Sequence, residues 1–310
     1  MIYINHINVS KYPLFVCLLL SFFIASAQEV DRQQLLRDIQ YLSSDELGGR
    51  KPLTEGNQLA AQFIRDRFKS LGLTSQFKSY TQRFPLMGNR GNGEALGEGT
   101  NITAFIPGQD SDRLIVITAH YDHLGTTEAG AIFNGADDNA SGTAALLALA
   151  EYFTKNKPRA SIILAALDAE EMGLQGAKAL VRDFPFSLEH VLVNVNMDMI
   201  SRNVKSELYA AGTLHYPHLK PALENAAKGA KVTLKFGHDE PGIGADDWTK
   251  ASDHAAFHDK GVPFVYFGVE DHPDYHKETD TFENIDPEFY YEAVRLIIRC
   301  VEKLDEALIP

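Results

Sequence analysis

Several apolar segments of this sequence lead into residues of the types that bind metal ions in proteins. In chain order these residues are His120, Asp122, Glu170, Glu171 and Asp198. A polar segment at 135–142 (GADDNASG) adds Asp137 and Asp138. Imidazole nitrogens and carboxylate oxygens are common ligands of zinc and related divalent ions. A carboxylate that directly follows an apolar strand is also costly to bury without a counter-charge. The pattern therefore predicts a metal-dependent active site.

The segments that carry these residues belong to an alternating order of strands and helices. Apolar or β-branched runs predict strands at 101–106, 114–118, 161–167, 191–197, 208–211, 232–236 and 262–267. Helices are predicted at 141–153, 174–184, 218–228 and 287–304, after two earlier helices and an irregular strand and loop over 74–100. This order is typical of a single α/β domain, with a mostly parallel twisted sheet and helices on both faces. Functional groups then meet at the carboxyl ends of the strands.

The C-terminal third offers two candidates for a further histidine ligand. His272 and His276 both lie in the loop after the predicted strand 262–267, so both reach the same edge of the sheet. Spacing alone does not separate them. The remaining histidines interpreted as non-ligands are His123, His215, His218 and His258.

A few other side chains have two open interpretations. His254 either approaches the site or makes a structural hydrogen bond. The aromatic residues that either line a substrate pocket or belong to the core are Phe236, Trp248 and Phe257.

Composition excludes several function classes. Lys and Arg total 29 against 42 Asp and Glu, which gives a formal net charge of -13. Such a surface repels phosphate backbones and anionic lipid headgroups, so nucleic acid is not an expected partner. The chain has only 2 cysteines, which excludes a disulfide framework and a cysteine-based zinc site. We expect Cys300 to be a buried thiol.

The N-terminus has the pattern of a secretory signal peptide. His6 and Lys11 precede an apolar run at 12–24, and small residues at 25–27 (ASA) suit a signal peptidase. The run is shorter than the roughly 20 residues that span a bilayer. We predict a signal peptide over 1–27, a catalytic domain over 28–310 and an exported product, periplasmic or extracellular, without stable membrane association. An uncleaved membrane anchor is the alternative.

Taken together, these segments resemble the co-catalytic di-zinc aminopeptidases, typified by bacterial leucyl aminopeptidases and yeast aminopeptidase Y. The matching segments follow the family's order over nearly all of the predicted mature chain: 120–122, 135–142, 170–173, 196–198, 252–254, 275–276 and 280–281. The resemblance implies a phosphorylase/hydrolase-like zinc exopeptidase fold and a metallo-aminopeptidase activity on peptides.

The resemblance also implies a ligand set for two zinc ions. One ion would be held by His120 and Asp198 and the other by Glu171 and His276, with Asp138 bridging both. Asp137 is the alternative bridge, because the two aspartates are adjacent. Two such ions, roughly 3.5–4 Å apart, activate one water and polarise the scissile carbonyl together. Manganese or cobalt would also suit these ligands.

Three further residues receive roles from the resemblance. Glu170 would act as the general base, Tyr275 would stabilise the developing oxyanion, and Asp122 would orient the imidazole of His120. The predicted function is removal of N-terminal residues from peptides. A carboxypeptidase of the same fold would need a cation for the terminal carboxylate, and only Arg202 and Lys250 lie near the motifs.

Other functions stay open as alternatives. They are a dipeptidase of the same fold, a glutaminyl cyclase, which keeps one zinc, and a non-catalytic binding homologue, which typically loses ligands or the base. The sequence does not reveal the side-chain preference or the oligomeric state.

Overall fold

The computed structural model describes residues 1, 29–88, 94–242 and 244–309 of the chain. Apart from its first residue, the signal peptide predicted over 1–27 lies outside this range, so its boundaries stay a prediction. Within the described part, no helix combines the length and the apolar character that crossing a bilayer requires.

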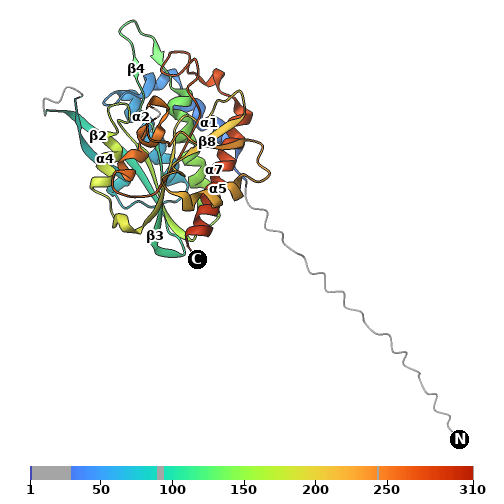
Figure 1. The fold of residues 1–310 in the computed structure, drawn as a ribbon. Coiled ribbons are helices and arrows are strands. Elements are labelled where there is room, and N and C mark those ends of the chain that lie inside the picture. Colours follow the sequence, from blue (N-terminus) through green and yellow to red (C-terminus); the bar gives the residue numbers. More distant parts are fainter. Residues whose placement is uncertain (2–28, 89–93, 243, 310) are drawn as a thin grey trace.

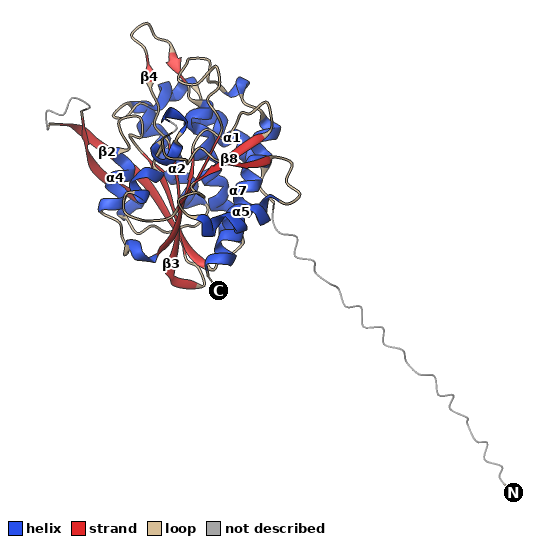
Figure 2. Cartoon of the chain, viewed as in Figure 1, coloured by secondary structure: helices blue, strands red, loops and turns tan. Residues whose placement is uncertain are grey.

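A mixed eight-stranded sheet forms the centre of the molecule (Figures 1 and 2), in the order β1-β2-β6-β3-β7-β10-β8-β9. Its strands are β1 (Thr81–Met87), β2 (Ala95–Ile106), β3 (Asp110–His120), β6 (Ala160–Leu167), β7 (Val191–Met197), β8 (Glu207–Ala211), β9 (Thr233–Phe236) and β10 (Phe264–Gly268). The neighbours β6, β3, β7 and β10 run parallel, whereas β1, β2 and β8 pair antiparallel with their neighbours toward the centre. The carboxyl ends of the four parallel strands therefore meet at one edge.

Helices cover both faces of this sheet (Figure 2). One layer contains α1 (Arg32–Leu42), α2 (Glu55–Ser70), α3 (Gly142–Lys155), α5 (Lys220–Ala227) and α7 (Pro287–Leu308), and the other contains α4 (Gln175–Arg182) and α6 (His254–His258). Strand β3 is buried on both faces, because Ile115 and Ile117 pack into the first layer while Leu114 and Val116 pack into the second. The α/β class predicted from the sequence is confirmed.

The segment 74–100 is more regular than its sequence predicts. Strand β1 and the part of β2 up to Ile102 form an antiparallel hairpin in which Thr81 pairs with Ile102 and Met87 with Ala95. Pro85 lies within β1, and this position is possible because β1 is an edge strand, where a missing N–H removes no ladder hydrogen bond. A second, small hairpin, β4 (Gly125–Thr126) with β5 (Ile132–Phe133), projects from one end of the molecule (Figure 1).

Candidate active site

The predicted metal ligands meet at the carboxyl edge of the parallel strands. His120 is the last residue of β3, and Asp198 directly follows β7, the strand that pairs with β3. Glu171 lies in the turn after β6, on the other side of β3. Three neighbouring strands thus carry one predicted ligand each at the same edge, as expected for parallel strands that end together.

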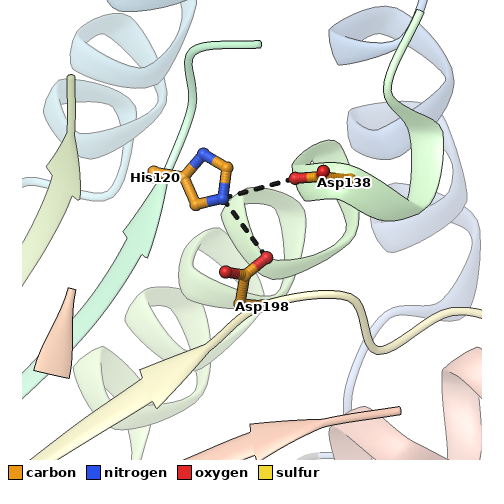
Figure 3. A group of neighbouring side chains, drawn as sticks. All are labelled: His120, Asp138 and Asp198. Carbon is orange, nitrogen blue, oxygen red and sulfur yellow. Dashed lines mark hydrogen bonds and ion pairs between the residues drawn. The ribbon is translucent and has the colours of Figure 1, made fainter. Parts of the chain in front are cut away.

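The first ligand group surrounds His120 (Figure 3). Its Nε2 atom lies 3.2 Å from Asp198 Oδ1 and 3.4 Å from Asp138 Oδ1. His120 is 1% exposed, Asp138 4% and Asp198 7%. Two carboxylates this deeply buried require positive charge nearby.

The second ligand group uses the other oxygen of the same aspartate. His276 Nε2 lies 3.0 Å from Asp138 Oδ2 and 3.5 Å from Glu171 Oε1. The carboxylate of Asp138 therefore faces one group with Oδ1 and the other group with Oδ2. This is the arrangement that a carboxylate needs in order to bridge two ions.

Asp137 and His272, the two residues that the sequence left as alternatives, pair with each other instead. Asp137 Oδ1 accepts hydrogen bonds of 2.7 Å from both the backbone N–H and the hydroxyl of Ser201. Asp137 Oδ2 lies 2.9 Å from His272 Nε2. Both side chains are thus engaged outside the two ligand groups, which contain Asp138 and His276.

The loop that carries His276 is attached to the turn that carries Asp138. The carboxylate of Asp280 accepts the backbone N–H groups of Asp137 and Asp138 at 2.9 and 3.0 Å. Together with the His272–Asp137 pair, these contacts hold two ligands that are far apart in sequence in a fixed relation.

A buried arginine that sequence reasoning missed supports the same region. Arg50 is 0% exposed, and its guanidinium donates to the backbone carbonyls of Tyr121, Asn134 and Gly135 at 2.7, 2.6 and 2.9 Å, and also to Leu42. It joins the turn after β3 to the segment before Asp138. The sequence carries no signal for this role, because all of these acceptors are main-chain atoms.

Asp122 lies beside His120, as the resemblance implies, and contacts a second element as well. Its Oδ1 is 3.7 Å from His120 Nδ1, while its backbone carbonyl is closer to that nitrogen, at 3.1 Å. The carboxylate also accepts the backbone N–H groups of Glu170 and Glu171 at 3.0 and 3.4 Å. Asp122 therefore positions both the imidazole and the turn after β6.

Glu170 and Tyr275 lie at the edge of the two ligand groups. Burial raises the pKa of Glu170 well above its ordinary value, and the negative carboxylate of Asp198 adds to this shift. The ring of Tyr275 stacks on that of His276, with 3.9 Å between centroids. Burial and the carboxylate of Asp138 raise the pKa of Tyr275, so its hydroxyl keeps its proton and can donate a hydrogen bond.

The electrostatics of the two groups fit divalent cations. Hydrogen bonds to Asp138 and Glu171 raise the pKa of His276 to about 10. Burial acts to raise the pKa of Glu171, but hydrogen bonds from His123 and His276 outweigh it and hold that pKa well below its ordinary value. The carboxylates thus attract protons onto the imidazoles in the absence of other cations. A metal ion supplies the same charge, and the nitrogen and oxygen donors are those that zinc prefers.

His123, interpreted as a non-ligand from the sequence, lies beside two of the predicted ligands. His123 Nδ1 lies 2.8 Å from Glu171 Oε1 and 3.8 Å from Asp138 Oδ2. One ligand atom from each of His123, Asp138 and Glu171 falls within 4.8 Å of the others, the same relation that holds for His120, Asp138 and Asp198. This proximity could not be predicted, because His123 lies past the end of β3, where no periodicity indicates which way a side chain points.

The structure also shows the surroundings of the side chains whose roles the sequence analysis left open. His254 Nε2 lies 2.8 Å from the carbonyl oxygen of Trp248, which is a structural contact. Phe257 is fully buried in the core between the sheet and α4, so it lines no pocket. Trp248 packs edge-to-face on Tyr266, whose hydroxyl donates to the Asp198 carbonyl at 3.4 Å. Phe236 packs against the main core.

The fold and the buried cluster together define an α/β protein whose histidine and carboxylate groups could hold a metal ion. The sequence profile of Peptidase family M28 matches residues 101–301, more than half of the chain, and the chain belongs to this family. The resemblance to zinc aminopeptidases is confirmed at this level.

The proteins whose sequences are similar to this one have longer chains. A "Probable leucine aminopeptidase" from Arthroderma otae is 28% identical over 211 residues, which cover 64% of this chain and 56% of that protein. A "Probable zinc metalloprotease" from Pyrenophora teres f. teres is 34% identical over 156 residues, 46% of this chain and 32% of that protein. This chain spans about half or less of the length of these relatives.

Solved structures share the fold over almost their whole length. A leucine aminopeptidase precursor from Bacteroides thetaiotaomicron has a TM-score of 0.73 at 18% identity, covering 89% of this chain and 98% of that chain. A glutaminyl cyclase from the same organism, bound to N-acetylhistamine, has a TM-score of 0.72 at 17% identity, covering 89% and 99%. The fold therefore does not by itself separate peptide hydrolysis from cyclisation.

Proposed function

We propose that this chain is a two-zinc aminopeptidase that removes N-terminal residues from peptides. The observation that carries the proposal is the orientation of Asp138, which turns Oδ1 toward His120 and Oδ2 toward His276. His120 and Asp198 would complete one ion site, and Glu171 and His276 the other. Zinc bound by these residues would supply the Lewis acidity that activates a water molecule and polarises the scissile carbonyl.

The protein side chains would move the protons of the reaction. Glu170 would take a proton from the water and pass it to the leaving amine, which requires a carboxylate with a raised pKa. Burial raises the pKa of Glu170, the positive charge of His120 opposes this shift, and the carboxylate of Asp198 adds to it, so the net pKa stays above its ordinary value. The protonated hydroxyl of Tyr275 would donate to the developing oxyanion.

The charges around the site favour an aminopeptidase over a carboxypeptidase. A carboxypeptidase needs a free cation to bind the terminal carboxylate of its substrate. Arg202 is paired with Asp274, and Lys250 lies 2.6 Å from Asp259 on the exposed surface. The site itself offers several carboxylates that could bind the ammonium group of a peptide N-terminus.

The test compares three versions of one leucine-initiated tripeptide: free, N-acetylated and C-terminally amidated. We expect release of leucine from the free and the amidated peptides, no reaction of the acetylated peptide, and loss of activity after zinc removal. Cleavage of the acetylated peptide together with failure of the amidated one would indicate a carboxypeptidase. Cyclisation of a glutamine-initiated peptide without hydrolysis would indicate a glutaminyl cyclase.

Export is a separate proposal that rests on the sequence of the first 27 residues. If the signal peptide is cleaved after Ala27, the N-terminus of the protein recovered from the producing cells will be Gln28. Mass spectrometry of the protein from the periplasm or the medium tests this. An intact Met1 on protein in the membrane fraction would instead indicate an uncleaved anchor.

A further inference from the structure

His123 is a third imidazole at the candidate metal site, and it faces the same two carboxylates as His276. The Nδ1 atom of His123 lies 2.8 Å from Glu171 Oε1 and 3.8 Å from Asp138 Oδ2. The Nε2 atom of His276 lies 3.5 and 3.0 Å from the same two oxygens. The two rings meet edge-to-face with 5.8 Å between their centroids. Glu171 Oε1 and Asp138 Oδ2 therefore each lie near a nitrogen of both imidazoles.

These separations match those between the ligands of a single ion. Zinc bonds to nitrogen and oxygen are about 2.0–2.2 Å long, so neighbouring ligands of a tetrahedral ion lie about 3.3 Å apart. The four nitrogen–oxygen distances in this group range from 2.8 to 3.8 Å. Some of these distances are shorter and some are longer than the separation of about 3.3 Å expected for a tetrahedral ion.

The ring of His123 is held in this position by its surroundings. It is 1% exposed, and a Cβ atom at Gly135 would lie only 2.5 Å from its Cδ2 atom. Gly135 has a φ of 57°, a conformation that glycine adopts without strain, so the close approach is built into the turn. The backbone N–H of His123 donates to the Arg50 carbonyl at 3.4 Å.

The imidazole of His123 makes its polar contacts with the described residues through one nitrogen, Nδ1. Its Nε2 atom is buried and has no hydrogen-bonding partner among the described residues. The polar contacts of the imidazole are thus to Glu171 and Asp138, through Nδ1. A buried imidazole that meets two carboxylates of a candidate metal site has the placement of a ligand.

We propose that His123 is a metal ligand, which with His276, Asp138 and Glu171 completes a closed site of two nitrogens and two oxygens. The proposal rests on the two-zinc function above and adds a residue to it. The two ion sites then differ. The site at His120 and Asp198 has three protein ligands and keeps a position open for water or substrate, whereas the site at Glu171 has four. The closed site should hold zinc more tightly and lose it last.

The first test is a crystal structure of the zinc-loaded protein with anomalous data at the zinc edge. We expect His123 Nδ1 about 2.0–2.1 Å from the ion next to Glu171. A separation greater than about 3 Å from that ion, with the hydrogen bond to Glu171 intact, would overturn the proposal and make His123 a positioning residue. Absence of an ion next to Glu171 would also overturn it.

The second test is zinc titration of the metal-free His123→Gln variant against a chromophoric chelator. We expect the affinity of the tighter site to fall more than roughly 100-fold, beyond the usual effect of losing a residue that only hydrogen-bonds a ligand. The affinity of the other site should change little. His190→Gln, at an exposed histidine, is the matched control and should leave both affinities unchanged. A tighter site that keeps its affinity in the folded His123→Gln variant would contradict the proposal.

Neither test depends on turnover. If zinc is bound through His123 but no peptide is hydrolysed, the proposed activity fails and the ligand assignment stands. If peptides are hydrolysed but His123 is remote from both ions, the ligand assignment fails and the proposed activity stands.

Discussion

The carboxylate of Asp122 accepts the backbone N–H of Glu170 at 3.0 Å, which joins the end of β3 to the turn after β6. The same residue contacts His120 Nδ1, through its carbonyl at 3.1 Å and its carboxylate at 3.7 Å. One residue thus positions a proposed metal ligand and the proposed base. A change at Asp122 should affect metal binding and catalysis together.

Replacing Asp122 with Asn tests this double role. The amide keeps one acceptor oxygen and gains a donor, so one of the two backbone N–H groups at 170 and 171 loses its partner. We expect zinc affinity to fall roughly 10–100-fold and kcat to fall as well. Chelator competition and steady-state kinetics measure the two effects. Asp112→Asn, at an exposed aspartate, is the control. Normal zinc affinity in Asp122→Asn would refute the positioning role.

The adjacent residues Glu170 and Glu171 should respond differently to the same substitution. Glu170→Gln should retain both zinc ions, while kcat falls about 10²- to 10⁴-fold because the base is lost. Glu171→Gln should instead lose one zinc ion. Metal analysis alongside kinetics separates the two outcomes. Loss of zinc from Glu170→Gln, with retention in Glu171→Gln, would mean that the roles are reversed.

Arg50 should be essential for stability although it is not expected to touch substrate. Arg50→Met would leave the four buried backbone carbonyls without their donor, and each unsatisfied buried acceptor costs about 1–3 kcal/mol. Allowing for relaxation of the loops, we expect the free energy of unfolding in urea to fall by at least about 3 kcal/mol. Arg50→Lys keeps the charge but lacks the planar fork, so it should recover only part of this loss. A loss below about 1 kcal/mol for Arg50→Met would show that these contacts add little.

His254 should make the fold sensitive to acid. Burial lowers the pKa of His254 to about 4 from the ordinary 6.5. The unfolded chain therefore binds a proton below pH 6.5, whereas the folded chain does so only near pH 4. The contribution of His254 to stability is complete above pH 6.5 and is lost as the pH falls toward 4, which amounts to about 3 kcal/mol over that interval.

Urea unfolding of the metal-free protein at pH 7.5 and pH 4.5 measures this effect. His254→Gln can still donate to the Trp248 carbonyl but has no proton to gain, so its stability should depend less on pH. The comparison between the two pH values removes the constant cost of the lost ring packing. An unchanged pH dependence in the variant would show that His254 does not contribute.

The elements that carry the ligands were predictable because buried parallel strands leave long apolar runs in the sequence. The strand β7 is such a run, and its predicted bounds agree with the structure. The resemblance implied Asp138 as the bridge, but the residue types alone left Asp137 as an alternative, because the directions of the two side chains depend on local backbone angles. Asp138 has a φ of -104° and a ψ of 95°, and Asn139 also departs from helical angles within the segment Ala136–Ser141, so adjacent side chains there point to different partners.

His123 and Arg50 illustrate what sequence patterns miss. His123 lies in the turn after β3, where its direction follows from the close approach of Gly135 rather than from any periodicity. Arg50 binds only carbonyl groups, and every residue except proline has the same donor and acceptor pair in its backbone. Contacts of this kind depend on three-dimensional packing and leave no residue-specific trace in the sequence.

The most direct measurement is a zinc titration of the metal-free protein, followed by the rate of hydrolysis of leucyl-p-nitroanilide at each zinc level. The account predicts no hydrolysis without zinc and a rate that becomes constant once two ions are bound per chain. Hydrolysis by fully metal-free protein, or binding that saturates at a single ion, would contradict it.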